Sequence, residues 1–385
     1  MTLARLTSAP ARANYTSHAR TPADLPRSRL CFTLLADRHI VHRPVHHSSI
    51  HPGACPMDLL AALLISLFAA VIPNLFYVAI FYWADRYERE PLWLASLVFI
   101  WGAIPAIIAS LVGEILIGSP FIDAPGSVAE AVMESAVVAP VVEELAKGLV
   151  LLIIFRWMRQ EFDGLLDGLL YGALVGFGFA MTENFFYFVG AFDQGGFGHL
   201  SLIIFLRAVI FGLNHAFYTA LIGMGLGLAR HATRRSTRLL YIGLGLLAAI
   251  LTHSLHNLGA SLASINALGL LLSLMVAGGG FGLILVVTVL AWQHERHTIR
   301  TELADEVGDL LAEEEFQSLT RQRWRRPFRR RPQAERDAAR RRQLCVELAM
   351  RKHRLRLLGA EREPELLQDI QRLREELRET RPSLA

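Results

Sequence analysis

Residues 139–150 read APVVEELAKGLV, and they place Glu143, Glu144 and Lys147 inside a stretch that is otherwise apolar. Charged side chains are costly in hydrocarbon, and ionisable residues within a membrane segment mark a functional site by default. The stretch therefore raises two questions: whether this part of the chain crosses a membrane, and what chemistry the three charges serve.

The charges of the chain are divided unevenly between its middle and its C-terminal end. Residues 294–385 hold 22 of the 39 Lys and Arg and 18 of the 35 Asp and Glu, whereas residues 57–293 hold 10 and 15. The sequence thus predicts a membrane domain over 57–293 and a charged, helical cytoplasmic tail over 294–385. Because Met57 opens directly into an apolar run, we expect residues 1–56 to be disordered or untranslated. A genuine basic extension is the alternative.

Seven stretches are long enough to cross a bilayer, which takes about 20 mostly apolar residues. Long lipid-facing runs satisfy their backbone as helices, so the expected fold class is all-α, a polytopic bundle. Arginines follow the first, third and fifth spans, while loops 118–129, 193–199 and 263–267 contain no Lys or Arg. The positive-inside rule then predicts a cell-membrane protein with its N-terminus outside and its C-terminus cytoplasmic. The spans are Leu59–Trp83, Leu92–Ile117, Ala136–Phe155, Gly164–Phe192, Leu200–Leu228, Leu239–Leu262 and Leu268–Trp292.

Polar side chains recur at a similar depth on four of these spans, from the third to the sixth. With a rise of ~1.5 Å per residue, they lie between roughly 7 and 23 Å below the outer surface. Agreement in depth across four helices predicts that they form one site. Lys147 is one helical turn from both acids of the third span, within reach of each. The predicted site residues are Glu143, Glu144, Lys147, Glu183, His215, His253 and Asn257.

These residue types point to hydrolysis of an amide bond within the membrane. A carboxylate of the acidic pair can act as general base on a water molecule. Histidines and an amide on a facing helix can donate hydrogen bonds to the oxyanion that develops.

The chain resembles the PrsW family of intramembrane proteases, in the clan that includes the CAAX prenyl endopeptidases and the Abi proteins. EELAK at 143–147 is similar to the family's EExxK, and FAMTE at 179–183 to its FxxxE. NHAFYTALIG at 214–223 and THSLHN at 252–257 look like its histidine-bearing segments, and DRYEREP at 85–91 like the patch after its first span. One departure concerns the HxxxH motif, which here reads HAFYT from His215 and HSLHN from His253.

The resemblance implies an intramembrane endopeptidase that cuts a membrane-anchored protein substrate in regulated proteolysis. Glu143 would be the general base, tuned by Glu144 and Lys147. His253 and Asn257 would stabilise the oxyanion. The cavity would be completed by Glu183 and His215. A mechanism without a cofactor is favoured, leaning on the clan resemblance, and zinc is the alternative because His and Glu side chains can ligate it.

Other readings stay open at this point. Buried Glu, Lys and His also form proton relays in transporters, and a non-catalytic scaffold could retain the same fold. We expect the segment RQRWRRPFRRRP, 321–332, to bind the anionic headgroups of membrane lipids and not nucleic acid. The apolar stripe from Leu366 to Leu377 is typical of a short coiled coil. The oligomeric state and the substrate are not predicted.

Overall fold

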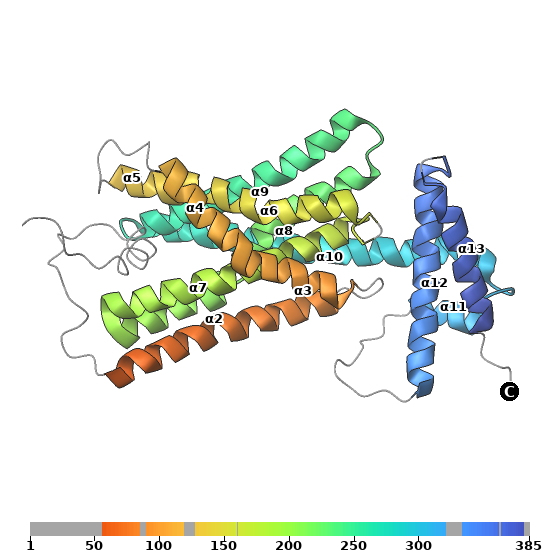
Figure 1. Ribbon diagram of the computed structural model, residues 1–385, viewed down its shortest axis with the longest axis horizontal. Coiled ribbons are helices and arrows are strands. Elements are labelled where there is room, and N and C mark those ends of the chain that lie inside the picture. Colours follow the sequence, from red (N-terminus) through yellow and green to blue (C-terminus); the bar gives the residue numbers. More distant parts are fainter. Residues whose placement is uncertain are drawn as a thin grey trace, which may run out of the picture.

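The computed structural model describes residues 56–84, 90–118, 128–159, 161–320, 333–361 and 363–380. Within these ranges every element of regular structure is a helix, which confirms the all-α fold class. A bundle of long helices adjoins a compact group of three helices near the C-terminus (Figure 1). The expectations for residues 1–55, for 85–89 of DRYEREP and for the Arg-rich segment 321–332 lie outside the described residues.

Five described segments are long and apolar enough to cross a membrane, so the chain is a multi-pass membrane protein, but the predicted count of seven is not confirmed. One of them, Leu165–His231, spans 67 residues and contains helices α7 (Leu165–Ile204) and α8 (Asn214–His231), and the first part of α7 runs antiparallel to α8. Helix α6 (Ala139–Trp157) is not among the five, and it carries the three charges of EELAK. The other four segments are Pro56–Ala84 (α2), Leu92–Ile117 (α3, Leu92–Trp101, with α4, Ile107–Gly118), Arg235–Ala263 (α9) and Ala267–Glu306 (mainly α10, Ala267–Glu302).

Helix α7 lies at the centre of the bundle because glycines let other helices approach it closely. Gly168, Gly172 and Gly176 recur every fourth residue on one face of α7, directly against the backbone of α8. A Cβ atom at Gly176 would lie 2.2 Å from the carbonyl oxygen of His215. On another face, a Cβ atom at Gly178 would lie 2.0 Å from the carbonyl oxygen of Phe99 in α3. Such small-residue contacts allow membrane helices to pack backbone to backbone.

The chain reverses direction inside α7, where Gly195 and Gly196 leave the helical conformation. Gly196 has φ +63°, which glycine adopts at little cost. This break falls within the loop 193–199 that the sequence predicts between two spans.

In the described part of the chain three π-helical segments interrupt the membrane helices, and two of them border the candidate site. They are η2 (Gly102–Ala106), η4 (Glu134–Val138) directly before α6, and η5 (Phe205–Ile210) shortly before α8. A π-segment widens the turn and re-aims the side chains that follow, and such segments are frequent at functional sites. Helix α5 (Val128–Met133) leads into η4.

The C-terminal helical domain has a hydrophobic core of its own. It is built from the end of α10 with α11 (Glu313–Thr320), α12 (Gln333–Leu358) and α13 (Glu365–Glu379). The stripe predicted on the last helix, Leu366, Ile370, Leu373 and Leu377, is buried, and the last three of these residues belong to this core. The stripe therefore packs within the domain.

One buried arginine joins this domain to the loop between α6 and α7. Arg354 of α12 donates to the carbonyl oxygen of Arg159 and to Asp163, both at 3.1 Å, and pairs with Glu363 at 2.9 Å. Its side chain is only 5% exposed, so these polar contacts replace water almost completely. The domain is thereby fixed to the segment that follows α6.

Candidate active site

Helix α6 brings two carboxylates and an ammonium group into the interior of the bundle. Glu143, Glu144 and Lys147 share one face because they are spaced three and four residues apart. Glu144 and Lys147 are fully buried, and Glu143 is 6% exposed. Pro140 stands in the first turn of α6, directly after the π-helical segment η4.

The Lys147 ammonium group is at the centre of the cluster, and each of its three N–H bonds has an acceptor. Nζ lies 3.0 Å from Glu143 Oε2, 2.8 Å from Glu144 Oε1 and 3.2 Å from His215 Nδ1. The ring of Phe179, the first residue of FAMTE, covers the ammonium at 3.8 Å from its centroid. An ammonium group has three donors and no acceptor, so its hydrogen-bonding capacity is filled.

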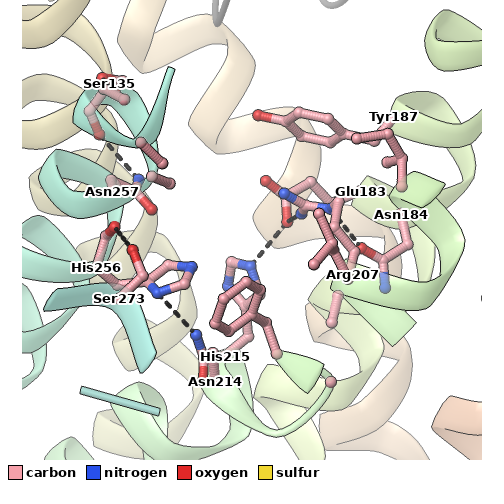
Figure 2. A pocket seen from close by; sticks show the side chains of 18 of the residues that line it. Ser135, Glu183, Asn184, Tyr187, Arg207, Asn214, His215, His256, Asn257 and Ser273 are labelled. Atoms are coloured by element: carbon pink, nitrogen blue, oxygen red, sulfur yellow. Dashed lines mark hydrogen bonds and ion pairs between the residues drawn. The ribbon is translucent and has the colours of Figure 1, made fainter. Parts of the chain in front are cut away.

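His215 links this cluster to a second ion pair. Since Lys147 can only donate, Nδ1 of His215 accepts, and the ring proton is assigned to Nε2. Nε2 then donates to Glu183 Oε2 at 2.8 Å, and the same oxygen accepts from Arg207 Nη2 at 2.6 Å. Figure 2 shows Glu183 between His215 and Arg207.

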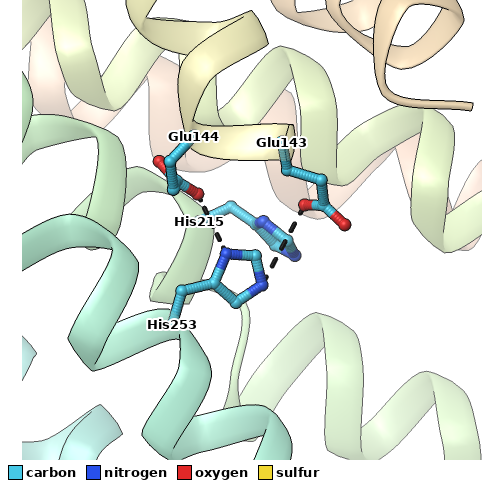
Figure 3. Close-up of side chains that lie close together, drawn as sticks. All are labelled: Glu143, Glu144, His215 and His253. Atoms are coloured by element: carbon cyan, nitrogen blue, oxygen red, sulfur yellow. Dashed lines mark hydrogen bonds and ion pairs between the residues drawn. The ribbon is translucent and has the colours of Figure 1, made fainter. Parts of the chain in front are cut away.

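His253 lies between the two adjacent glutamates (Figure 3). Its Nδ1 is 3.0 Å from Glu144 Oε1, so the neutral ring carries its proton there and leaves Nε2 with a lone pair. Nε2 faces Glu143 Oε2 at 3.9 Å, which is too long for a direct hydrogen bond. The ring of Tyr218 stacks on His253 at 4.6 Å, and Thr219 donates to Glu144 Oε2 at 3.1 Å.

A cavity of about 280 Å³ opens beside this cluster, and its lining divides the charged groups into two sets. Glu143, Glu183, His215 and His253 line the cavity, whereas Glu144 and Lys147 lie behind them. Among the described residues, no group donates to Glu143 Oε1. Glu143 is therefore the member of the acidic pair that is open to a molecule in the cavity.

Asn257 lines the same cavity, one turn after His253. Its Nδ2 donates to the carbonyl oxygen of Ser135 in η4 at 2.8 Å, which leaves the second amide hydrogen available (Figure 2). His256 is turned away from the glutamates and contacts Asn214 at 3.1 Å. Asn257 thus ties α9 to η4 in addition to facing the cavity.

The donors present are chemically suited to a divalent cation. Glu143, Glu144, His215 and His253 each offer an oxygen or nitrogen, and these four atoms lie within 4.8 Å of one another. Carboxylate and imidazole ligands fit zinc. However, Lys147 is hydrogen-bonded to three of the four residues, so a cation bound by the full set would require its ammonium group to move.

The structure brings all seven residues of the predicted site to one region, and it adds others that sequence reasoning did not include. Thr219 occupies the place of the second histidine of HxxxH, and its hydroxyl group donates a hydrogen bond to Glu144. Asn184 and Tyr187 contact Arg207, which the predicted site does not include either. Their spacing from Glu183, one and four residues, was the available signal.

The family model described as "PrsW family intramembrane metalloprotease" matches residues 90–292, just over half of the chain. The chain is similar to the Protease PrsW of Geobacillus kaustophilus, with 28% identity over 49% of this chain and 76% of that protein. It is also similar to the Protease PrsW of Bacillus subtilis, with 27% identity over 49% of this chain and 79% of that protein. No solved structure matches the chain.

Proposed function

The chain belongs to the PrsW family of membrane proteases, and we propose that it hydrolyses a peptide bond of a membrane-anchored protein with a water molecule activated by Glu143. The observation that carries this proposal is the arrangement of the acidic pair. Glu143 faces the cavity with one carboxylate oxygen free, while Glu144 and Lys147 are buried behind it and hydrogen-bonded to fixed partners.

In this mechanism Glu143 removes a proton from a water molecule as the water oxygen attacks the carbonyl carbon of the substrate. Collapse of the tetrahedral intermediate breaks the C–N bond, and the proton passes from Glu143 to the leaving amine. Lys147 compensates the charge of the ionised carboxylate at 3.0 Å. Glu144 holds the His253 ring through Nδ1, with Nε2 directed toward Glu143.

Donors for the oxyanion come from the same cavity. Asn257 retains one amide hydrogen after bonding to Ser135. His253 can donate from Nε2 only as an imidazolium ion, because its Nδ1 hydrogen is directed at Glu144. Oxyanion donors of this kind contribute on the order of 10²–10³-fold in rate.

The description of the family as metalloproteases gives a metal-dependent version of the same hydrolysis. Glu143, His215 and His253 would hold the ion, and bound zinc supplies a Lewis acid and lowers the pKa of its water ligand. We favour the metal-free version because His215 is committed to Lys147 and Glu183 through both ring nitrogens.

The test is cleavage of a fluorescent single-span protein by the purified chain in proteoliposomes. We expect Glu143→Gln to abolish cleavage, because the amide has the same shape and cannot accept the proton. Glu114→Gln is the matched control, since this glutamate is also in a membrane segment but does not line the cavity. Activity should survive 1,10-phenanthroline. Loss of activity with the chelator, restored by zinc, would replace the glutamate mechanism with the metal-dependent one.

A proton relay is the second candidate, and a continuous chain of contacts favours it. Arg207, Glu183, His215, Lys147, Glu144 and His253 are joined in that order by separations of 2.6 to 3.2 Å. If wild-type protein cleaves nothing but transfers protons into liposomes loaded with a pH-sensitive dye, the protease proposal is wrong. A scaffold would do neither.

We further propose that the C-terminal helical domain is cytoplasmic, that membrane lipids bind the Arg-rich segment 321–332, and that cleavage serves regulated proteolysis. The arginine distribution of the loops supports the orientation. Protease protection of a tagged C-terminus tests the orientation. In sealed right-side-out vesicles the tag should be protected, and it should be digested only after the vesicles are opened.

A further inference from the structure

Arg207 is held on three sides at the wall of the cavity. Its Nη2 pairs with Glu183 at 2.6 Å, its Nε donates to Asn184 Oδ1 at 2.8 Å, and its guanidinium carbon lies 3.7 Å above the centroid of the Tyr187 ring. All three partners come from one stretch of α7, whereas Arg207 comes from η5. The guanidinium plane is therefore fixed in position and orientation.

The remaining edge of the guanidinium group carries Nη1, and it is the free edge. Among the described residues no acceptor contacts Nη1, while Arg207 lines the cavity and its side chain is 24% exposed. A guanidinium group offers five N–H donors in a rigid fork, so Nη1 contributes two that are unused. Two directed donors thus border the cavity that Glu143 also lines.

A substrate inside a membrane needs such donors. In a membrane helix every backbone carbonyl is paired within the helix, and a carbonyl released by unwinding has no water to replace that bond. Hydrolysis requires an unwound segment, because the attacked carbonyl must leave its helical hydrogen bond. A donor supplied by the enzyme offsets the cost of unwinding.

We propose that Arg207 binds the substrate, with Nη1 donating to a backbone carbonyl of an unwound segment next to Glu143. This inference rests on the proposed peptidase function and names the substrate class: single membrane spans that unwind locally. The pairing with Glu183 neutralises the guanidinium charge, so the site accepts a neutral carbonyl and does not demand an acidic side chain. Asn184 and Tyr187 are positioning residues for this donor.

Binding can be measured separately from cleavage in the Glu143→Gln background. The probes are two fluorescent peptides of about 25 residues, one with a central Gly-Gly pair that unwinds readily and one with Leu-Leu at the same place. We expect the Gly-Gly peptide to bind more tightly. Arg207→Lys keeps a cation beside Glu183 but cannot hold both partners and present a free edge. It should weaken binding of the Gly-Gly peptide by about tenfold to a hundredfold, the range for a hydrogen bond to a charged group.

Arg230→Lys is the matched control. Arg230 is a second arginine in the bundle, stacked on Phe155 at 4.1 Å and bonded to the Phe155 and Phe162 carbonyls, and it does not line the cavity. This variant should keep the preference for the Gly-Gly peptide. Thermal unfolding in detergent identifies a variant that fails to fold. In that case Tyr187→Leu, which removes the phenol group beneath the guanidinium and leaves Glu183 and Asn184 in place, should reduce the same preference by a smaller factor.

Two outcomes would overturn the inference. One is an unchanged affinity for the Gly-Gly peptide when Arg207→Lys is added to Glu143→Gln and the protein is folded, together with a loss of kcat alone when Arg207→Lys is made in the chain that retains Glu143, which would mark a purely positioning role. The other is an equal loss of affinity for both peptides. A preference that depends on Arg207, found while the chain with Glu143 intact cleaves nothing, would instead support the binding site and contradict the peptidase function.

Discussion

Gly176→Ala tests whether the backbone contact between α7 and α8 sets the geometry of the active site. The new Cβ atom would lie 2.2 Å from the carbonyl oxygen of His215, whereas ordinary contacts begin near 3.4 Å, so the helices must separate by 3.4 − 2.2 = 1.2 Å. His215 is bonded to Lys147 at 3.2 Å and to Glu183 at 2.8 Å. A shift of this size breaks the first bond and stretches the second to as much as 4.0 Å.

We expect kcat/KM to fall about 100-fold, the effect of misplacing a catalytic group by about 1 Å. Overpacking should also lower the free energy of unfolding by about 1–3 kcal/mol. Gly243→Ala is the matched control, because a Cβ atom at this glycine of α9 meets nothing within 4 Å. Cleavage of the fluorescent single-span protein is compared at equal folded concentration. Wild-type activity in Gly176→Ala would show that the close α7–α8 contact does not position His215.

Three further predictions concern buried charge, a buried thiol and the domain junction. Lys147→Met should destabilise the protein by about 3–5 kcal/mol in detergent unfolding, because it leaves two buried carboxylates without their cation. Burial raises the pKa of the Cys345 thiol to about 12, so the thiol stays protonated below that pH and maleimide labelling of the folded protein should remain slow from pH 7 to 9. Arg354→Ala should make trypsin release the C-terminal helical domain several-fold faster, because the contacts to Arg159 and Asp163 are lost.

Each of these predictions has its own control. Adding Glu144→Gln to Lys147→Met should recover part of the lost stability, and no recovery would contradict the electrostatic explanation. The labelling is done with Cys31→Ser and Cys55→Ser in place, and fast labelling at pH 7 without unfolding would show that Cys345 is accessible. Arg372→Ala removes an arginine that is 61% exposed and should leave proteolysis unchanged.

The residues that the structure brings together around the cavity could be predicted from the sequence because charge in an apolar segment is so costly. Glu143, Glu183, His215 and His253 come from four helices, and their similar depth could be counted directly from the helical rise. Depth is preserved when straight helices pack side by side. The prediction therefore did not depend on knowing which helices are neighbours.

The contacts of the site depend on rotation about the helix axes, which depth does not determine. The π-segments η4 and η5 change that rotation just before α6 and α8, and neither has a sequence signal as clear as a charge. For this reason the contacts of Arg207 could not be predicted, although the spacing of Asn184 and Tyr187 from Glu183 could have placed both residues near the site. The sequence also could not show which surface covers the apolar stripe from Leu366 to Leu377 on α13. The same spacing of apolar residues suits packing against another chain and packing within the same domain.

Helix α10 joins the cavity wall to the C-terminal helical domain without a break. Ser273, near its beginning, lines the cavity and bonds to the His256 carbonyl at 2.9 Å, while Ile299, near its end, is part of the domain core. The 26 residue steps from Ser273 to Ile299 span about 39 Å of continuous helix. A tilt of about 3° at the domain would displace Ser273 by about 2 Å over that length. A displacement of the C-terminal helical domain relative to the bundle would thus be transmitted through one rigid helix to the wall of the cavity.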